Sequence, residues 1–208
     1  MKLPTDIRPQ STEISLDAGD PALDFANTLD DRNAPEPTEG IPDYQALLAF
    51  AFASGLIDET ACDRLAAEAA KRPYEAVAIH ASALALREAI YEVAAALVEG
   101  ISPATPHLNV INRAAAGALA AGELVYEGEG FRWRWDGAEQ AFERPTWSIA
   151  DAAIRLLTQA DLSRLRICAA DDCGWVFLDE TRNRSRKWCD MNTCGNRAKV
   201  ARYRQRRE

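Results

Sequence analysis

The chain has 208 residues, of which 48% are hydrophobic and 27% are charged, and its formal net charge is −8. This length is enough for one core of about 150 residues plus a small module, and the hydrophobic content is ordinary for a globular protein. No apolar run approaches the roughly 18 residues of a membrane-spanning helix, so the composition argues against a membrane protein.

The charge is divided unevenly along the chain. Residues 162–208 hold 12 basic and 6 acidic side chains, a net charge of +6, whereas residues 1–161 hold 12 basic and 26 acidic side chains, a net charge of −14. This division predicts an acidic domain over residues 1–161 and a basic one over residues 162–208. The basic segment could face a polyanion or dock on the acidic domain, and the sequence leaves both possibilities open.

The first predicted elements are a short strand and a helix. Apolar and polar residues alternate over residues 13–17, which is typical of a strand. Asp20 followed by Pro21 predicts the start of a helix, with the carboxylate as its cap. We expect a loop over residues 31–42, because prolines and a glycine interrupt this stretch.

Three polar residues on this first helix are candidates for a binding site. Asp24, Asn27 and Thr28 are spaced i, i+3 and i+4 and therefore share one helix face. They form either a buried hydrogen-bond network or part of a ligand pocket.

Further helices follow, delimited by capping aspartates and by glycine or proline stops. We expect them over residues 43–52, 58–72 and 73–99, from about residue 106, and from 146 to about 159. In the longest of them, six apolar side chains suit burial: Val77, Leu84, Ile90, Tyr91, Val93 and Leu97.

Between the last two helices the hydrophobic period changes to two. Residues 123–127 and 131–135 flank a Gly-Glu-Gly loop and predict a β-hairpin. Phe131, Trp133 and Trp135 fall on one face and arginines on the other. This alternation fits a stacking platform for single-stranded nucleic acid or a sheet face that buries its rings against the helices. The acidic surroundings favour burial.

Four of the five cysteines form two matched pairs near the C-terminus. Four residues separate Cys168 from Cys173 and Cys189 from Cys194, and fifteen residues separate the pairs. This pattern predicts one zinc ion held by four thiolates. Two disulfides are the alternative, but the chain opens without an apolar secretion segment, so we expect a reducing cytoplasm. Four cysteines leave zinc no open position, which indicates a structural metal.

The elements around these cysteines suggest a treble-clef-like module. Residues 165–168 predict an entering strand, residues 175–178 a second strand, and residues 184–188 its partner. A helix is expected from about residue 192, where its N-terminus would stabilise thiolate charge.

Basic residues crowd this module. Arg182, Arg184 and Arg186 alternate, so an extended segment would present them as a comb that straddles phosphates. Asn196 and Arg197 have the side chains for reading adenine and guanine, but capping and pairing with the metal site explain them equally well. The full set of predicted nucleic-acid contacts is Arg182, Arg184, Arg186, Lys187, Asn196, Arg197, Lys199, Arg202 and Arg204.

The residues from Cys173 to Lys199 resemble the CGNR zinc finger family, whose name matches the tetrad Cys194-Gly195-Asn196-Arg197. The Gly-Trp-x-Phe-x-Asp, Arg-Asn-x-Ser-Arg and Trp-Cys-x-Met pieces match as well. The sequence departs from the family at Thr181, where serine is usual, and at Arg184, where a small residue is common. Such proteins usually carry an N-terminal domain described as a putative stress-induced transcription regulator, and its signature is similar to residues 23–28. The resemblance implies a DNA-binding regulator.

These observations predict an α+β protein. It combines a mostly helical N-terminal domain, with a short strand and a β-hairpin, and a treble-clef-like four-cysteine zinc finger. We expect a cytoplasmic transcription regulator that binds duplex DNA through the finger, while the N-terminal domain senses a small molecule or forms a homodimer. The alternatives are a zinc-stabilised module that binds RNA or protein, and an enzyme in the N-terminal domain. The enzyme ranks last, because the sequence offers no nucleophile–base pair, glycine-rich phosphate loop or HExxH motif.

Overall fold

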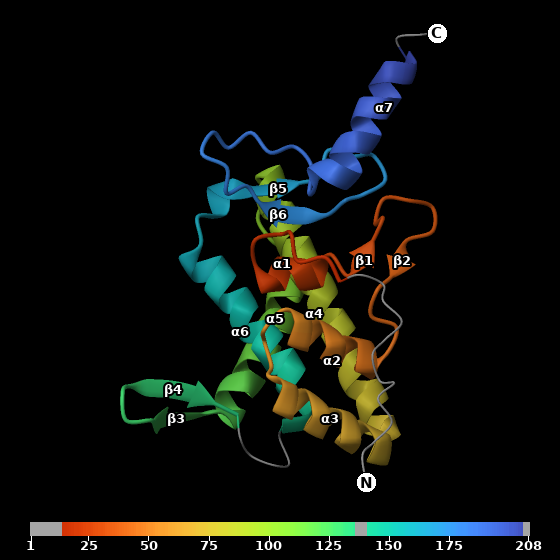
Figure 1. The fold of residues 1–208 in the computed structure, drawn as a ribbon. Coiled ribbons are helices and arrows are strands. Elements are labelled where there is room, and N and C mark those ends of the chain that lie inside the picture. Colours follow the sequence, from red (N-terminus) through yellow and green to blue (C-terminus); the bar gives the residue numbers. More distant parts are fainter. Residues whose placement is uncertain (1–13, 136–140, 206–208) are drawn as a thin grey trace.

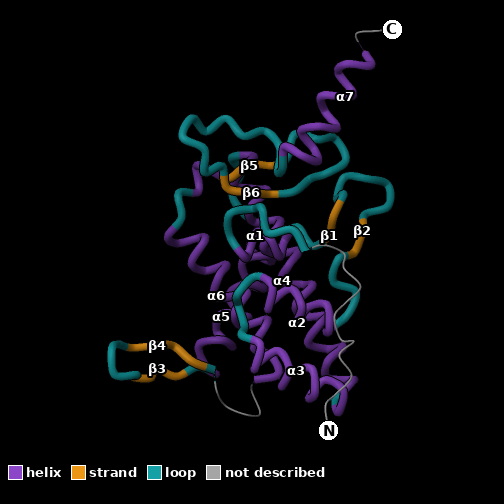
Figure 2. The backbone as a smooth tube through the Cα atoms, in the orientation of Figure 1, coloured by secondary structure: helices purple, strands orange, loops and turns teal. Residues whose placement is uncertain are grey.

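The structure is a computed structural model that describes residues 14–135 and 141–205. Its α-helices are α1 (Pro21–Ala26), α2 (Tyr44–Ala53), α3 (Glu59–Lys71), α4 (Pro73–Glu99), α5 (Thr105–Ala121), α6 (Arg144–Gln159) and α7 (Asn196–Gln205). Three antiparallel strand pairs join β1 (Leu29–Asp30) to β2 (Thr38–Glu39), β3 (Glu123–Tyr126) to β4 (Phe131–Arg134), and β5 (Leu165–Ile167) to β6 (Val176–Leu178). The α+β class is confirmed, and Figure 2 shows how little of the backbone is strand.

Helices α1 to α6 form the body of the molecule, and the β5–β6 pair lies against its α1 end (Figure 1). Helix α7 projects from the β5–β6 end, far from the β3–β4 hairpin. Among the described residues, no helix has both the length and the apolar character needed to cross a membrane.

The predicted starts of the first three helices are confirmed by their caps, but α1 ends at Ala26, so Asn27 and Thr28 follow this helix instead of lying on it. The carboxylates of Asp20, Asp43 and Asp58 accept hydrogen bonds from backbone N–H groups in the first turns of α1, α2 and α3. Helix α4 ends at Gly100, whose φ of 72° lies in the left-handed region that glycine adopts most easily.

The predicted strand over residues 13–17 is wrong for its described part, residues 14–17, and Glu13 lies outside the described residues. The Ser15 hydroxyl donates to the Asp17 carboxylate at 2.6 Å, a local bond that competes with strand pairing. One backbone bond to β6 forms just beyond, from Leu178 N to Ala18 O at 2.8 Å. Strand β2 lies within the predicted loop over residues 31–42 and pairs with β1, which directly precedes that loop.

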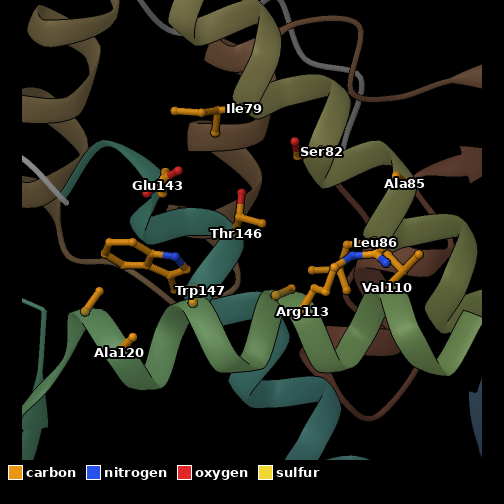
Figure 3. Close-up of a pocket in the computed structure, with 13 residues that line it drawn as sticks. Ile79, Ser82, Ala85, Leu86, Val110, Arg113, Ala120, Glu143, Thr146 and Trp147 are labelled. Atoms are coloured by element: carbon orange, nitrogen blue, oxygen red, sulfur yellow. The ribbon is translucent and has the colours of Figure 1, made fainter.

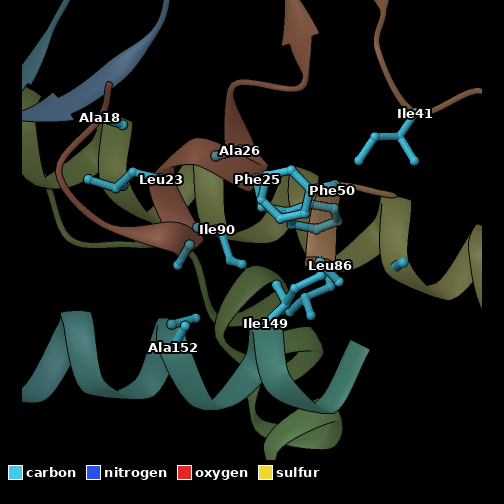
Figure 4. Close-up of a cluster of buried hydrophobic side chains, with 14 of the residues drawn as sticks. Ala18, Leu23, Phe25, Ala26, Ile41, Phe50, Leu86, Ile90, Ile149 and Ala152 are labelled. Carbon is cyan, nitrogen blue, oxygen red and sulfur yellow. The ribbon is translucent and has the colours of Figure 1, made fainter. Parts of the chain in front are cut away.

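A continuous apolar core fills the space between α1, α2, α4 and α6 (Figure 4). Leu23, Phe25, Phe50 and Ile149 are completely buried in it. The same core continues into β6, where Val176 and Phe177 are also completely buried, so the two predicted domains share one hydrophobic interior.

The burial prediction for α4 is confirmed at Ile90 and Val93 and is wrong at Val77, which is 68% exposed. Leu84, Tyr91 and Leu97 are half-buried. Tyr74, one turn before Val77, is exposed too. The first turns of α4 therefore leave one side uncovered, and an apolar residue there is not part of the core.

The β3–β4 hairpin forms as predicted, with Leu124 opposite Trp133 and Tyr126 opposite Phe131. The predicted burial of its rings is wrong, because Phe131 is 71% and Trp133 is 41% exposed. The hairpin extends away from the helices (Figure 1). Trp135, at its base, is the ring that does reach the body, where its Nε1 donates to Ala118 O at 2.7 Å.

Candidate metal centre and nucleic-acid interface

The four predicted zinc ligands, Cys168, Cys173, Cys189 and Cys194, come together as unbridged, buried thiols whose sulfur atoms all lie within 4.8 Å of one another. The Cys173–Cys189 and Cys189–Cys194 sulfur distances are 3.7 and 3.6 Å. A regular tetrahedron with Zn–S bonds of about 2.3 Å has edges of about 3.8 Å. The four cysteines therefore fit one structural zinc ion.

Local backbone geometry places these sulfurs. Cys168 directly follows β5, and its N–H donates to Trp175 O at 2.8 Å, which closes the first cysteine loop. Gly174, next to Cys173, has a φ of 72°, and a Cβ there would lie 3.0 Å from Asn33 Oδ1. Cys194 lies in a π-helical turn, Met191–Gly195, that leads into α7. The predicted knuckle and C-terminal helix are thus present, with β5 leading into the knuckle and β6 following it.

The predicted pairing of residues 175–178 with residues 184–188 is wrong, because β6 pairs with β5 in the register Leu165–Leu178 and Ile167–Val176. Asp179 explains the difference. Its buried carboxylate accepts hydrogen bonds from Thr181 N and Arg186 N, both at 2.9 Å, and closes the intervening residues into a loop. The role of Asp179 was not predicted, although Asp-x-Thr is a spacing typical of side-chain-capped turns.

Sulfur atoms this close perturb one another's acidity. Hydrogen bonding to Cys168 raises the pKa of the Cys173 and Cys189 thiols, and hydrogen bonding to Cys173 lowers the pKa of Cys168. Without a cation, ionisation of one thiol therefore disfavours ionisation of its neighbours. A divalent cation at the centre would stabilise all four thiolates together.

Arg197 lies beside the metal centre. Its guanidinium donates to Cys194 Sγ at 3.1 Å and to Asp172 Oδ2 at 3.0 Å. The hydrogen bond to Cys194 raises the pKa of Arg197, so the cation is held next to sulfur charge. Asn196 is exposed, and its amide donates to Asn192 O at 3.0 Å within the same helical segment. Of the two roles considered for Arg197, the geometry favours pairing with the metal site.

The predicted arginine comb does not form. Arg186 lies 4.4 Å over the Phe177 ring and donates to the carbonyl groups of Cys189 and Asp17. Arg184 has a positive φ of 50° and reaches back to Asp161 at 3.0 Å. A comb requires an extended strand, and the Asp179-centred loop takes its place. Arg184 and Arg186 therefore make contacts within the protein that stabilise the finger.

Other predicted basic contacts remain exposed: Arg182, Lys187, Lys199 and Arg204. None of them has an ion-pair partner within residues 14–135 and 141–205. Lys199 and Arg204 lie on α7, and Arg204 lines a shallow depression together with Asn192, Asn196 and Val200. The side chain of Arg202 lies outside the described residues.

The Asp24, Asn27 and Thr28 set joins the body to the finger. Asn27 donates to Val176 O at 2.8 Å and accepts from Val176 N at 2.9 Å, so its amide pairs with β6 as a neighbouring strand would. Asp24 accepts from Ala18 N at 2.9 Å, and burial raises its pKa to about 6. The Thr28 hydroxyl donates to Phe25 O at 2.7 Å. Each group has a backbone partner, as the hydrogen-bond network requires, and all three residues also line a cavity of about 850 Å³.

Backbone bonds reinforce this junction. The N–H groups of Arg32 and Asn33 donate to Cys173 O at 2.9 Å and to Asp172 O at 3.2 Å. A loop of the body thus holds the first cysteine knuckle directly, and the metal centre and the helical body are mechanically connected.

Comparison with protein-family models gives two matches. The ABATE model, described as a putative stress-induced transcription regulator, matches residues 19–160, and the CGNR zinc finger model matches residues 164–207. No curated protein matches the chain.

Proposed function

Since the chain belongs to the ABATE family of putative stress-induced transcription regulators and carries a CGNR zinc finger, we propose that it binds duplex DNA through residues 162–208. In this proposal, residues 1–161 form the regulatory domain, and one structural zinc ion organises the DNA-binding domain. The reducing cytoplasm, which keeps thiols available to zinc, is the compartment that suits such a protein.

The observation that carries the proposal is the position of α7. This helix projects away from the acidic body and carries the exposed cations Lys199 and Arg204, which no described carboxylate neutralises. Arg182 and Lys187 add two more exposed cations from the preceding loop. Because the body carries a net charge of −14, phosphate contacts would be confined to the finger, where they release counterions.

The proposal is tested by fluorescence anisotropy of the zinc-loaded full chain with a labelled random-sequence duplex, across a range of salt. A variant with Lys199→Gln and Arg204→Gln removes the two α7 cations. The matched control carries Arg64→Gln and Arg132→Gln, which remove the same charge from exposed positions on the body.

We expect the α7 variant to bind more weakly and to lower the slope of log K against log salt by about 2, since each lost phosphate contact removes about 0.9. The control should retain the wild-type slope. Equal slopes for all three proteins would contradict the proposed interface. A clear preference for an RNA duplex of the same length would instead support the RNA-binding alternative.

Two features of the body would suit a regulatory role. The exposed rings of the β3–β4 hairpin would suit association of two copies, and a cavity in the body would suit a small-molecule effector. Within the proposal, either event at the body changes the position of the finger through the Asn27–Val176 junction.

A further inference from the structure

A cavity of about 530 Å³ opens between α4, α5 and the start of α6 (Figure 3). Helix α5 creates it, because Ala114, Gly117 and Ala121 follow one another at helical spacing and present small side chains to it. This volume lies within the range of about 300–1,000 Å³ that is typical of small-molecule sites. Its lining includes neither the four cysteines nor Asp24, Asn27 and Thr28.

The cavity contains hydrogen-bonding groups that the protein leaves unused. Thr146 is only 8% exposed, its Oγ1 has no hydrogen-bond partner, and Figure 3 shows this hydroxyl directed into the cavity. The indole of Trp147 lies beside it, facing Gly117. A buried hydroxyl without a partner costs free energy unless a bound molecule supplies one.

The charged groups of the cavity stand at opposite ends. Arg113 lies beside Leu86 and Val110, whereas Glu143 lies on the other side of Thr146, above Trp147 in this view (Figure 3). Arg113 is exposed and has no carboxylate partner in the described part of the chain. A ligand anion would pair with Arg113, and a second negative charge at the other end would be repelled by Glu143.

Apart from Ser82, whose hydroxyl donates to Ala78 O at 3.0 Å, the remaining wall is apolar, with Ile79, Leu86 and Val110 as its largest aliphatic side chains. We infer that this cavity binds a small amphipathic monocarboxylic acid. The carboxylate pairs with Arg113, the apolar body fills the space left by Ala114 and Gly117, and a polar substituent reaches Thr146. The role of this acid as the effector of the regulator rests on the proposed function, but the binding site itself does not.

The test is isothermal titration of the zinc-loaded full chain, without DNA, with 1-naphthoate and with decanoate. Uncharged 1-naphthalenemethanol is the matched neutral probe. Gly117→Leu and Ala114→Leu each fill the cavity, and Arg113→Gln removes its cation. Arg64→Gln is the matched control, because Arg64 is an exposed arginine on α3 that does not line the cavity. Zinc content and thermal unfolding verify that each variant is folded.

We expect at least one of the acids to bind, and we expect the neutral alcohol to bind the wild type about tenfold more weakly than 1-naphthoate. Arg113→Gln should weaken acid binding about tenfold, the filled variants should lose it, and Arg64→Gln should leave it unchanged.

The inference is overturned if the folded wild type binds neither acid, or if binding survives in a folded filled variant. It is also overturned if Arg113→Gln binds as tightly as the wild type. Arg113 is exposed, so this last comparison holds even if both filled variants fail to fold. Since no DNA is present, failure of DNA binding leaves this result intact.

Discussion

The body and the finger are stabilised in different ways. In the body, large apolar side chains such as Leu23, Phe50 and Ile149 are completely buried between helices. The finger contributes Val176 and Phe177 to that same core, and beyond them it depends on four sulfurs and on hydrogen bonds to the body. The charge boundary in the sequence therefore does not separate two independent interiors.

Metal removal is the strongest test of this contrast. A structural four-cysteine zinc site contributes roughly 10–16 kcal/mol of apparent binding free energy, so a chelator should unfold residues 168–205 while the α1–α6 body keeps its helical circular dichroism. Hydrogen exchange read segment by segment measures this outcome. Cys194→Ser should lose the zinc, and Cys62→Ser, outside the cluster, should retain one ion per chain. If residues 168–205 stay protected from exchange after chelation, the finger does not depend on the metal as proposed.

The second test removes the bonds that join the two regions. Asn27→Ala leaves Val176 N and O without partners in the interior, and each buried unpaired group costs about 1–3 kcal/mol. We expect a loss of about 2–4 kcal/mol in the free energy of unfolding, measured by urea denaturation. Asn112→Ala, an exposed position on α5, should change it by less than about 0.5 kcal/mol. If Asn27→Ala lowers the free energy of unfolding no more than Asn112→Ala does, these bonds do not stabilise the junction.

A third test concerns the buried charge beside the junction. Burial raises the pKa of Asp24 from 3.8 to about 6, so between these values the native state binds more protons than the unfolded state. Stability due to this group therefore falls as the pH rises through that window. Asp24→Asn, whose amide oxygen can still accept from Ala18 N, should match the wild type below about pH 4 and exceed it by about 2 kcal/mol above about pH 6.

Chemical denaturation of the two proteins across pH measures that difference, and zinc loss at low pH affects both alike. A difference that is constant from pH 4 to pH 8 would contradict a raised pKa at Asp24.

The smallest effect is expected at Arg184. Its φ of 50° is a left-handed conformation that glycine adopts without strain. Arg184→Gly should therefore be more stable than Arg184→Ala by about 1 kcal/mol, since both variants lose the exposed Asp161 pair and only alanine keeps the strain. Zinc competition with a chromogenic chelator compares the two fingers. A more stable alanine variant would show that the backbone relaxes at this position.

Much of the local structure could be predicted because its causes are local. Aspartate caps, proline starts and Gly100 define helix ends through bonds within one turn. The cysteine spacing likewise identified the metal ligands, because few arrangements of two short loops can surround zinc. The predictions that were wrong concern Val77, the hairpin rings, the strand over residues 13–17, the partner of β6 and the arginine comb. For Val77 and the hairpin rings, the outcome depends on which surface another segment covers. In the other cases, local hydrogen bonds of side chains replace the predicted strands.

The sequence by itself determined the helices, the zinc ligands and the division of charge, since capping, ligand spacing and composition act over a few residues. Tertiary structure alone decided that Asn27 pairs with Val176 and that Arg186 braces the finger instead of projecting from it. It also decided that small residues on α5 face an unfilled space. Those features arise between segments up to 169 residues apart, and they depend on packing geometry that no local pattern encodes.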